Sequence, residues 1–153
     1  MTSATRFVAA LIIATATVSG ADLVLTGTWA GAKAEIPADN TVVLAMYDRN
    51  GTCCGGPAVV LAGLGNLRTA LKDTAKVVLV AVDVTADATA EQATAAAALH
   101  HTDGIPLLID GARATAGSFG LTLEMTMTYV IRRADGTHET AFSPAQVRKK
   151  LGL

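Results

Sequence analysis

The two cysteines of this 153-residue chain, Cys53 and Cys54, are adjacent in sequence and are its only cysteines. They follow the apolar run Thr41–Tyr47 and precede the sequence Gly55-Gly56-Pro57, a pattern that indicates a turn from a strand into a helix. A thiolate is both a nucleophile and a metal ligand, and the dipole of a helix N-terminus favours it over the thiol. The pair therefore predicts either thiol–disulfide exchange or binding of a soft metal ion.

Direct bonding between these two sulfurs is disfavoured by backbone geometry. Neighbouring Cα atoms lie about 3.8 Å apart across a trans peptide, whereas disulfides usually need about 4.4 Å or more. A Cys53–Cys54 bond would therefore be strained and easily reduced. The alternative without chemistry is that the thiols are small, buried apolar side chains.

The N-terminus has the pattern of a secretory signal peptide. Arg6 supplies positive charge, Phe7–Val18 is almost wholly apolar, and small residues follow as far as Ala21. Because the apolar stretch is shorter than the roughly 20 residues that span a bilayer, we expect a removable signal rather than an anchor. We predict a signal peptide at residues 1–20, a domain at residues 21–153, and a periplasmic or otherwise extracytoplasmic location. Membrane attachment is expected only if the segment stays uncleaved.

Charge and motifs exclude several classes of function. The 12 Lys and Arg residues nearly balance the 13 Asp and Glu residues, so we expect no nucleic-acid partner. The chain has no zinc-ligand spacing and no phosphate-binding glycine loop. Asp83, Asp87 and Glu91 are expected to be helix-entry and solvated acids, and His100 and His101 to lie at a helix end.

The hydrophobic pattern predicts alternating strands and helices, followed by a hairpin and a last helix. A helix between two apolar strands favours parallel pairing of those strands. The expected elements are a weak strand at Asp22–Leu25, a strand at Thr41–Tyr47, a helix at Pro57–Leu71, a strand at Lys76–Val84, a helix at Thr89–His101, an extended segment at Ile105–Asp110, a short helix at Ala112–Phe119, hairpin strands at Thr126–Arg133 and Thr137–Phe142, and a helix from Ser143-Pro144 to Leu151.

This order, with thiols at the start of the first helix after a central strand, resembles the thioredoxin fold over roughly Thr41–Leu153. It is most similar to the redoxin branch, which includes thioredoxin-like disulfide reductases, peroxiredoxins and SCO copper-assembly proteins. The matching stretches are VVLAMYDRNGTCCGGP, VVLVAVDVTADATAEQ and MTYVIRRADG. The resemblance implies an α/β three-layer sandwich in which a central mixed sheet is flanked by helices.

The disulfide reductases supply the leading functional hypothesis. The resemblance implies that Cys53 attacks a partner protein as a thiolate. The second cysteine of the family's Cys-x-x-Cys falls on Gly56 here, so Cys54 would either resolve the mixed disulfide from an unusual position or modulate the reactivity of Cys53. The partner would be a protein disulfide or dithiol. The expected substrate-binding residues are Thr52 and Gly55 beside the thiols, and Thr126, which stands where the family has a cis-proline.

Two other branches and one inert alternative remain open. Peroxiredoxins carry Pro-x-x-x-Thr-x-x-Cys, and this chain has no proline upstream of Cys53 in the loop. SCO proteins bind copper with the help of a histidine near the start of the hairpin strand. The corresponding position here lies near Met125, and it has no histidine. Even so, Cys53, Cys54, Met125 and Met127 could form a soft Cu(I) site, although alternation of the methionines with Tyr129 is also typical of core residues. The third alternative is a redox-inactive binding module.

Overall fold

The computed structural model describes residues 23–51, 56–74, 76–122 and 127–153. In chain order the elements are β1 (Thr28–Trp29), β2 (Thr41–Tyr47), α1 (Gly56–Leu71), β3 (Val77–Asp83), α2 (Ala90–Leu99), β4 (Leu107–Ile109), α3 (Ala114–Ser118), β5 (Met127–Arg132), β6 (His138–Ala141) and α4 (Pro144–Leu151). Strands and helices alternate from β2 to β5.

The strands form one mixed sheet in the order β1-β4-β3-β2-β5-β6. The strands β2, β3 and β4 are parallel, whereas β1, β5 and β6 each pair antiparallel with their neighbours. The parallel pairing of β2 with β3 confirms the prediction, and it follows from the crossover through α1. The carboxyl ends of β2, β3 and β4 therefore meet at one edge of the sheet.

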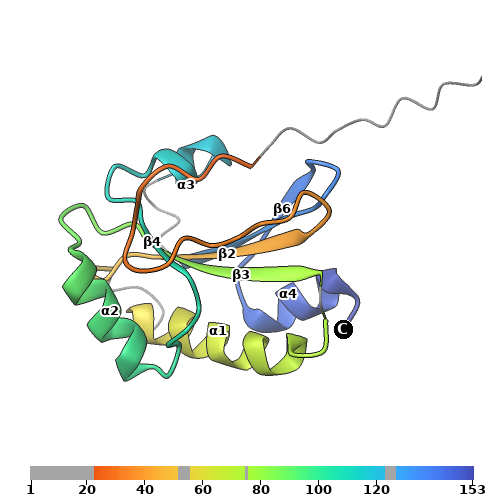
Figure 1. Ribbon diagram of the computed structural model, residues 1–153, viewed down its shortest axis with the longest axis horizontal. Helices are drawn as coiled ribbons and strands as arrows, with labels where there is room; N and C mark the ends of the chain where they lie inside the picture. The colour runs from red at the N-terminus through yellow and green to blue at the C-terminus, as the bar shows by residue number, and fades with distance from the viewer. Residues whose placement is uncertain (1–22, 52–55, 75, 123–126) are drawn as a thin grey trace, which may run out of the picture.

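The sheet lies between two layers, so the predicted α/β three-layer architecture is confirmed (Figure 1). One face is covered by α1, α2 and α4, and the other by α3 and the segment that precedes β2. Alternate residues of β2 serve the two cores because side chains alternate along a strand. Val43, Ala45 and Tyr47 belong to the first core, and Val42, Leu44 and Met46 to the second.

Helix α1 packs on the sheet as its sequence predicts. The predicted apolar positions Val60, Leu64, Leu67 and Leu71 are all buried. They recur at helical spacing, so one face of the helix meets the core. This packing fixes the axis of α1, which begins at Gly56.

One predicted element is wrong. Leu23–Leu25, the described part of the expected weak strand, is not a strand, and β1 lies instead at Thr28–Trp29. This two-residue strand pairs with Leu108 and Ile109 of β4. Its position depends on that distant partner, which the local sequence does not reveal. The other predicted helices and strands are present: β2 has the predicted bounds, α1 begins one residue earlier than predicted, and the described parts of the rest are slightly shorter.

The predicted signal peptide, residues 1–20, lies outside the described residues. Among the described residues, no helix has the length and apolar character needed to cross a bilayer.

Candidate functional site

The residues predicted to carry chemistry fall in two short segments outside the described residues. Residues 52–55 contain Thr52, Cys53, Cys54 and Gly55, and residues 123–126 contain the other two predicted site residues, Met125 and Thr126. The structure therefore defines this site through the residues that flank the two segments.

The flanking residues meet at one edge of the sheet. Tyr47, the last residue of β2, is the register partner of Met127, the first residue of β5. A Cβ atom placed on Gly56 would lie 3.5 Å from the Gly51 carbonyl oxygen, so the residues that bracket 52–55 are close together. Gly56 has a φ of 64°, a conformation that favours glycine. Residues 52–55 follow β2, and residues 123–126 directly precede β5. The two segments therefore adjoin neighbouring strands.

A tight turn leads from β2 toward the thiols. The Gly51 amide donates to the Asp48 carbonyl at 3.0 Å. The Asn50 amide donates to Asp48 Oδ1 at 2.9 Å. Asp48 therefore shapes the turn with both its backbone and its side chain.

The Asp48 carboxylate also forms an ion pair with a residue of the layer that contains α3. Arg113 Nη2 lies 2.6 Å from Asp48 Oδ2, and both side chains are largely buried, at 19% and 14% exposure. Arg113 directly precedes α3 and has a left-handed backbone, with φ of 55° and ψ of 30°. An arginine 65 residues away thus fixes the first residue after β2.

The next residue, Arg49, is held from the opposite side by the end of β3. Its Nε atom lies 2.7 Å from Asp83 Oδ2, and its amide donates to Thr85 Oγ1 at 2.8 Å. Thr85 in turn donates its amide to Asp83 Oδ1 at 3.0 Å. The guanidinium also donates to Gln92 Oε1 of α2 at 3.1 Å.

The expectation that Asp83 is a solvated acid is wrong, because its side chain is fully buried. It ends a strand that is covered on both faces, and a buried carboxylate requires an ionic or hydrogen-bonding partner. Arg49 and Thr85 provide those partners. Asp87 and Glu91 are exposed, as expected.

Tyr47 places a phenol beneath this network. Its side chain is fully buried, and none of the described residues accepts from or donates to its hydroxyl. Burial raises the pKa of Tyr47 well above its usual range; the nearby Asp83 carboxylate raises it further, and Arg49 partly opposes this. The tyrosine is therefore neutral at physiological pH.

Sequence reasoning did not identify Asp48, Arg49 or Arg113 as site residues. The available signal was the Asp-Arg pair directly after the most buried strand, since a charged pair at that position requires partners. The identity of those partners depends on residues 34 and 65 positions away.

The described residues contain no group of three or more His, Cys, Asp or Glu side chains that could hold a metal ion. Met46 is 1% exposed in the core. Of the expected Cu(I) ligands, Cys53, Cys54 and Met125 lie outside the described residues, and Met127 is the first residue of β5.

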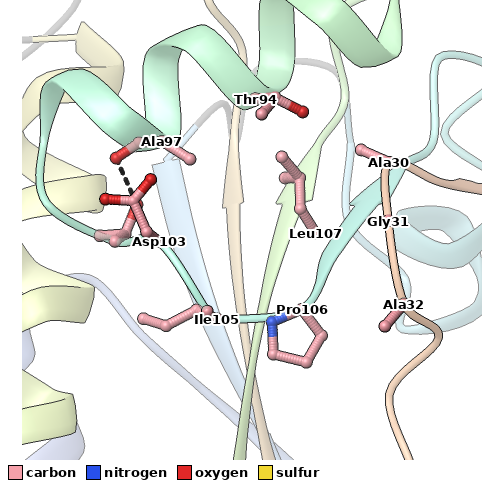
Figure 2. Close-up of a pocket in the computed structure, with 11 residues that line it drawn as sticks. Ala30, Gly31, Ala32, Thr94, Ala97, Asp103, Ile105, Pro106 and Leu107 are labelled. Atoms are coloured by element: carbon pink, nitrogen blue, oxygen red, sulfur yellow. Dashed lines mark hydrogen bonds between the residues drawn. The ribbon is translucent and has the colours of Figure 1, made fainter.

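A small pocket lies elsewhere, between α2 and the start of β4 (Figure 2). Its volume is about 240 Å³, and Thr94, Ala97 and Leu107 line it together with the Ala30–Ala32 segment. The Thr102 hydroxyl donates to the Ala97 carbonyl at 3.1 Å. The pocket is smaller than the roughly 300 Å³ of typical ligand sites, and it lies at the amino end of β4, so it does not belong to the thiol site.

No protein-family model matches the chain, and no curated protein sequence matches it. Several solved structures are similar to the chain. One is a thiol-disulfide oxidoreductase from Bacteroides fragilis, with 16% identity, a TM-score of 0.59 and coverage of 78% of this chain and 86% of that chain. Another is a secreted Mycobacterium tuberculosis disulfide oxidoreductase homologous to E. coli DsbE, with 14% identity, a TM-score of 0.57 and coverage of 74% and 81%.

A third is StoA from Bacillus subtilis, with 14% identity, a TM-score of 0.53 and coverage of 72% of this chain and 81% of that chain. The fold is thioredoxin-like. At these identities the likeness establishes the fold, while the activity must be argued from the site. In this thioredoxin-like fold, the turn at Asp48–Gly51 and the start of α1 flank the segment that carries both cysteines.

Proposed function

We propose that the chain is an exported thiol–disulfide oxidoreductase. The observation that carries the proposal is the place of the cysteine segment between the end of β2 and the start of α1, in a fold shared with proteins named as disulfide oxidoreductases. A helix N-terminus beside a thiol favours the thiolate, which is the attacking form.

Cys53 is the proposed nucleophile. Its thiolate attacks one sulfur of a partner disulfide, which forms a mixed disulfide and releases the other partner sulfur as a thiolate that takes up a proton. Cys54 then attacks the Cys53 sulfur and releases the second partner thiol. The partner leaves reduced by two electrons, and the two cysteines are left oxidised.

Export is proposed from the pattern of residues 1–20. The M. tuberculosis protein of the same fold is described as secreted, which supports the same location for this chain. An oxidising compartment would supply disulfide-bearing partner proteins.

The test is an exchange assay with a disulfide-bearing protein. Cys53→Ser should abolish exchange, and Cys54→Ser should leave a mixed disulfide that accumulates. Equal activity in both variants would contradict the assignment of roles. Full activity in the Cys53→Ser/Cys54→Ser double variant would contradict thiol chemistry altogether.

Copper carriage is the alternative proposal, in which Cys53, Cys54 and Met125 hold Cu(I) through soft sulfur donors. It predicts tight copper uptake that each cysteine substitution removes. Inert thiols and no copper would instead favour a redox-inactive binding module.

A further inference from the structure

Arg113 has a backbone conformation that its residue type rarely adopts. Among the described residues, only Arg113 and His101 have a positive φ without being glycine, both at 55°. Such a conformation persists where the surrounding structure requires it, and it is common at functional positions.

The Arg113 side chain is not what starts α3. Its side chain makes no capping hydrogen bond to the helix. Asp110 does this instead, because its Oδ1 accepts from the Ala114 amide at 2.8 Å and its Oδ2 accepts from the Ala116 amide at 3.2 Å. The Arg113 amide donates to the Asp110 carbonyl at 2.8 Å, which sets the tight turn.

The turn directs the guanidinium across the molecule to Asp48. The two oxygens of that carboxylate have separate roles: Oδ2 accepts from Arg113 Nη2 at 2.6 Å, while Oδ1 accepts from the Asn50 amide at 2.9 Å. Charge-assisted hydrogen bonds of this length in a largely buried setting are strong. The ion pair therefore fixes the orientation of the carboxylate that shapes the 48–51 turn.

We infer that Arg113 is a positioning residue that acts through Asp48 to hold the 48–51 turn, from which the cysteine segment begins. Its effect on thiol exchange rests on the proposed function. Correct placement of an attacking group is worth large factors in rate, and small displacements lose them. Arg113 thus couples the α3 side of the sheet to thiol reactivity through Asp48.

The experiment compares Arg113→Gly with the wild-type protein. Glycine removes the side chain but suits the left-handed backbone, so any fall in melting temperature should reflect the lost ion pair with Asp48 and not backbone strain. Amide hydrogen exchange at Asn50 and Gly51, measured by NMR, should accelerate about tenfold, and thiol exchange with 4,4′-dithiodipyridine should slow about tenfold. Arg113→Lys keeps the charge and should restore part of the rate.

A second variant guards against a folding effect. Asp48→Asn keeps an oxygen for the Asn50 amide but removes the ion pair, and it should also slow exchange. The Arg113→Gly/Asp48→Asn double variant should lose less than the two single losses added together, because both single changes remove the ion pair that the two residues share. Lys76→Met is the matched control, since Lys76 pairs at 3.6 Å with Asp39 through two exposed side chains.

Wild-type rates and amide protection in Arg113→Gly would overturn the inference. So would an equal loss of exchange in the Lys76→Met control. If the wild-type protein itself exchanges no disulfide, the proposed function fails, while the amide protection of Asn50 and Gly51 still decides the role of Arg113.

Discussion

Tyr47 of β2 and Asp83 of β3 are register partners at the carboxyl edge of the sheet, and both are fully buried. A phenol and a carboxylate thus share one corner beneath the turn that leads to the cysteines. The charge of Asp83 is held by Arg49 at 2.7 Å, so the corner depends on that ion pair. Buried pairs of this kind are costly to break by removing one partner.

Arg49→Met is expected to lower the free energy of unfolding by roughly 3–5 kcal/mol, because it leaves the Asp83 carboxylate buried without its cation. The measurement is urea unfolding. Arg49→Met/Asp83→Asn removes both charges and should recover much of the loss. A single variant as stable as the wild-type protein would contradict the structural role of the pair.

Both tyrosines of the chain should ionise late in the folded state. Burial raises the pKa of Tyr129 from its ordinary value of 10.0 to about 12, and burial also raises the pKa of Tyr47. The folded state therefore holds these protons more tightly than the unfolded state. The stabilisation is full below about pH 10 and is lost as the pH rises through the folded pKa values.

The measurement is the ultraviolet absorbance of tyrosinate during an alkaline titration, with a urea-unfolded sample as the control. The unfolded sample should titrate near pH 10, and the folded protein only at higher pH, together with loss of structure. Coincident titration curves would contradict the burial of these phenols.

Gly63 and Gly65 of α1 should respond oppositely to alanine. A Cβ at Gly63 would lie 2.6 Å from Pro144 Cγ and would also clash with the Tyr129 hydroxyl, so Gly63→Ala should destabilise by about 1–3 kcal/mol. Gly65 has no atom within 4 Å of such a Cβ, so Gly65→Ala should stabilise by roughly 0.5–1 kcal/mol. Thermal unfolding measures both; equal effects would contradict the packing of α1 on α4 and β5.

The sequence predicts strands and helices well where burial repeats along the chain. The run Val42–Tyr47 is almost purely apolar because β2 is covered on both faces, and α1 shows a regular apolar stripe. The sequence does not predict the position of β1, because a two-residue strand is too short to show an alternating pattern. Its existence depends on pairing with β4.

The ion pairs around the site are also not predictable from local sequence, because they too depend on partners distant in the chain. Arg113 meets Asp48, and Arg49 meets Asp83, only after the sheet brings distant segments together. An acid at a strand end usually faces water, so the local sequence predicts a solvated Asp83 and does not show the arginine that buries it. The roles of Cys53 and Cys54 stay predictions from sequence and fold.

The most direct test of the central claim is native mass spectrometry of the mature protein, purified without air from its own cell envelope, with thiol-alkylation counting on the same sample. We expect a metal-free protein that carries a readily reduced disulfide or is joined through Cys53 to a partner protein. Bound copper that is lost when the cysteines are substituted, or two free thiols that never exchange, would contradict the assignment as a thiol–disulfide oxidoreductase.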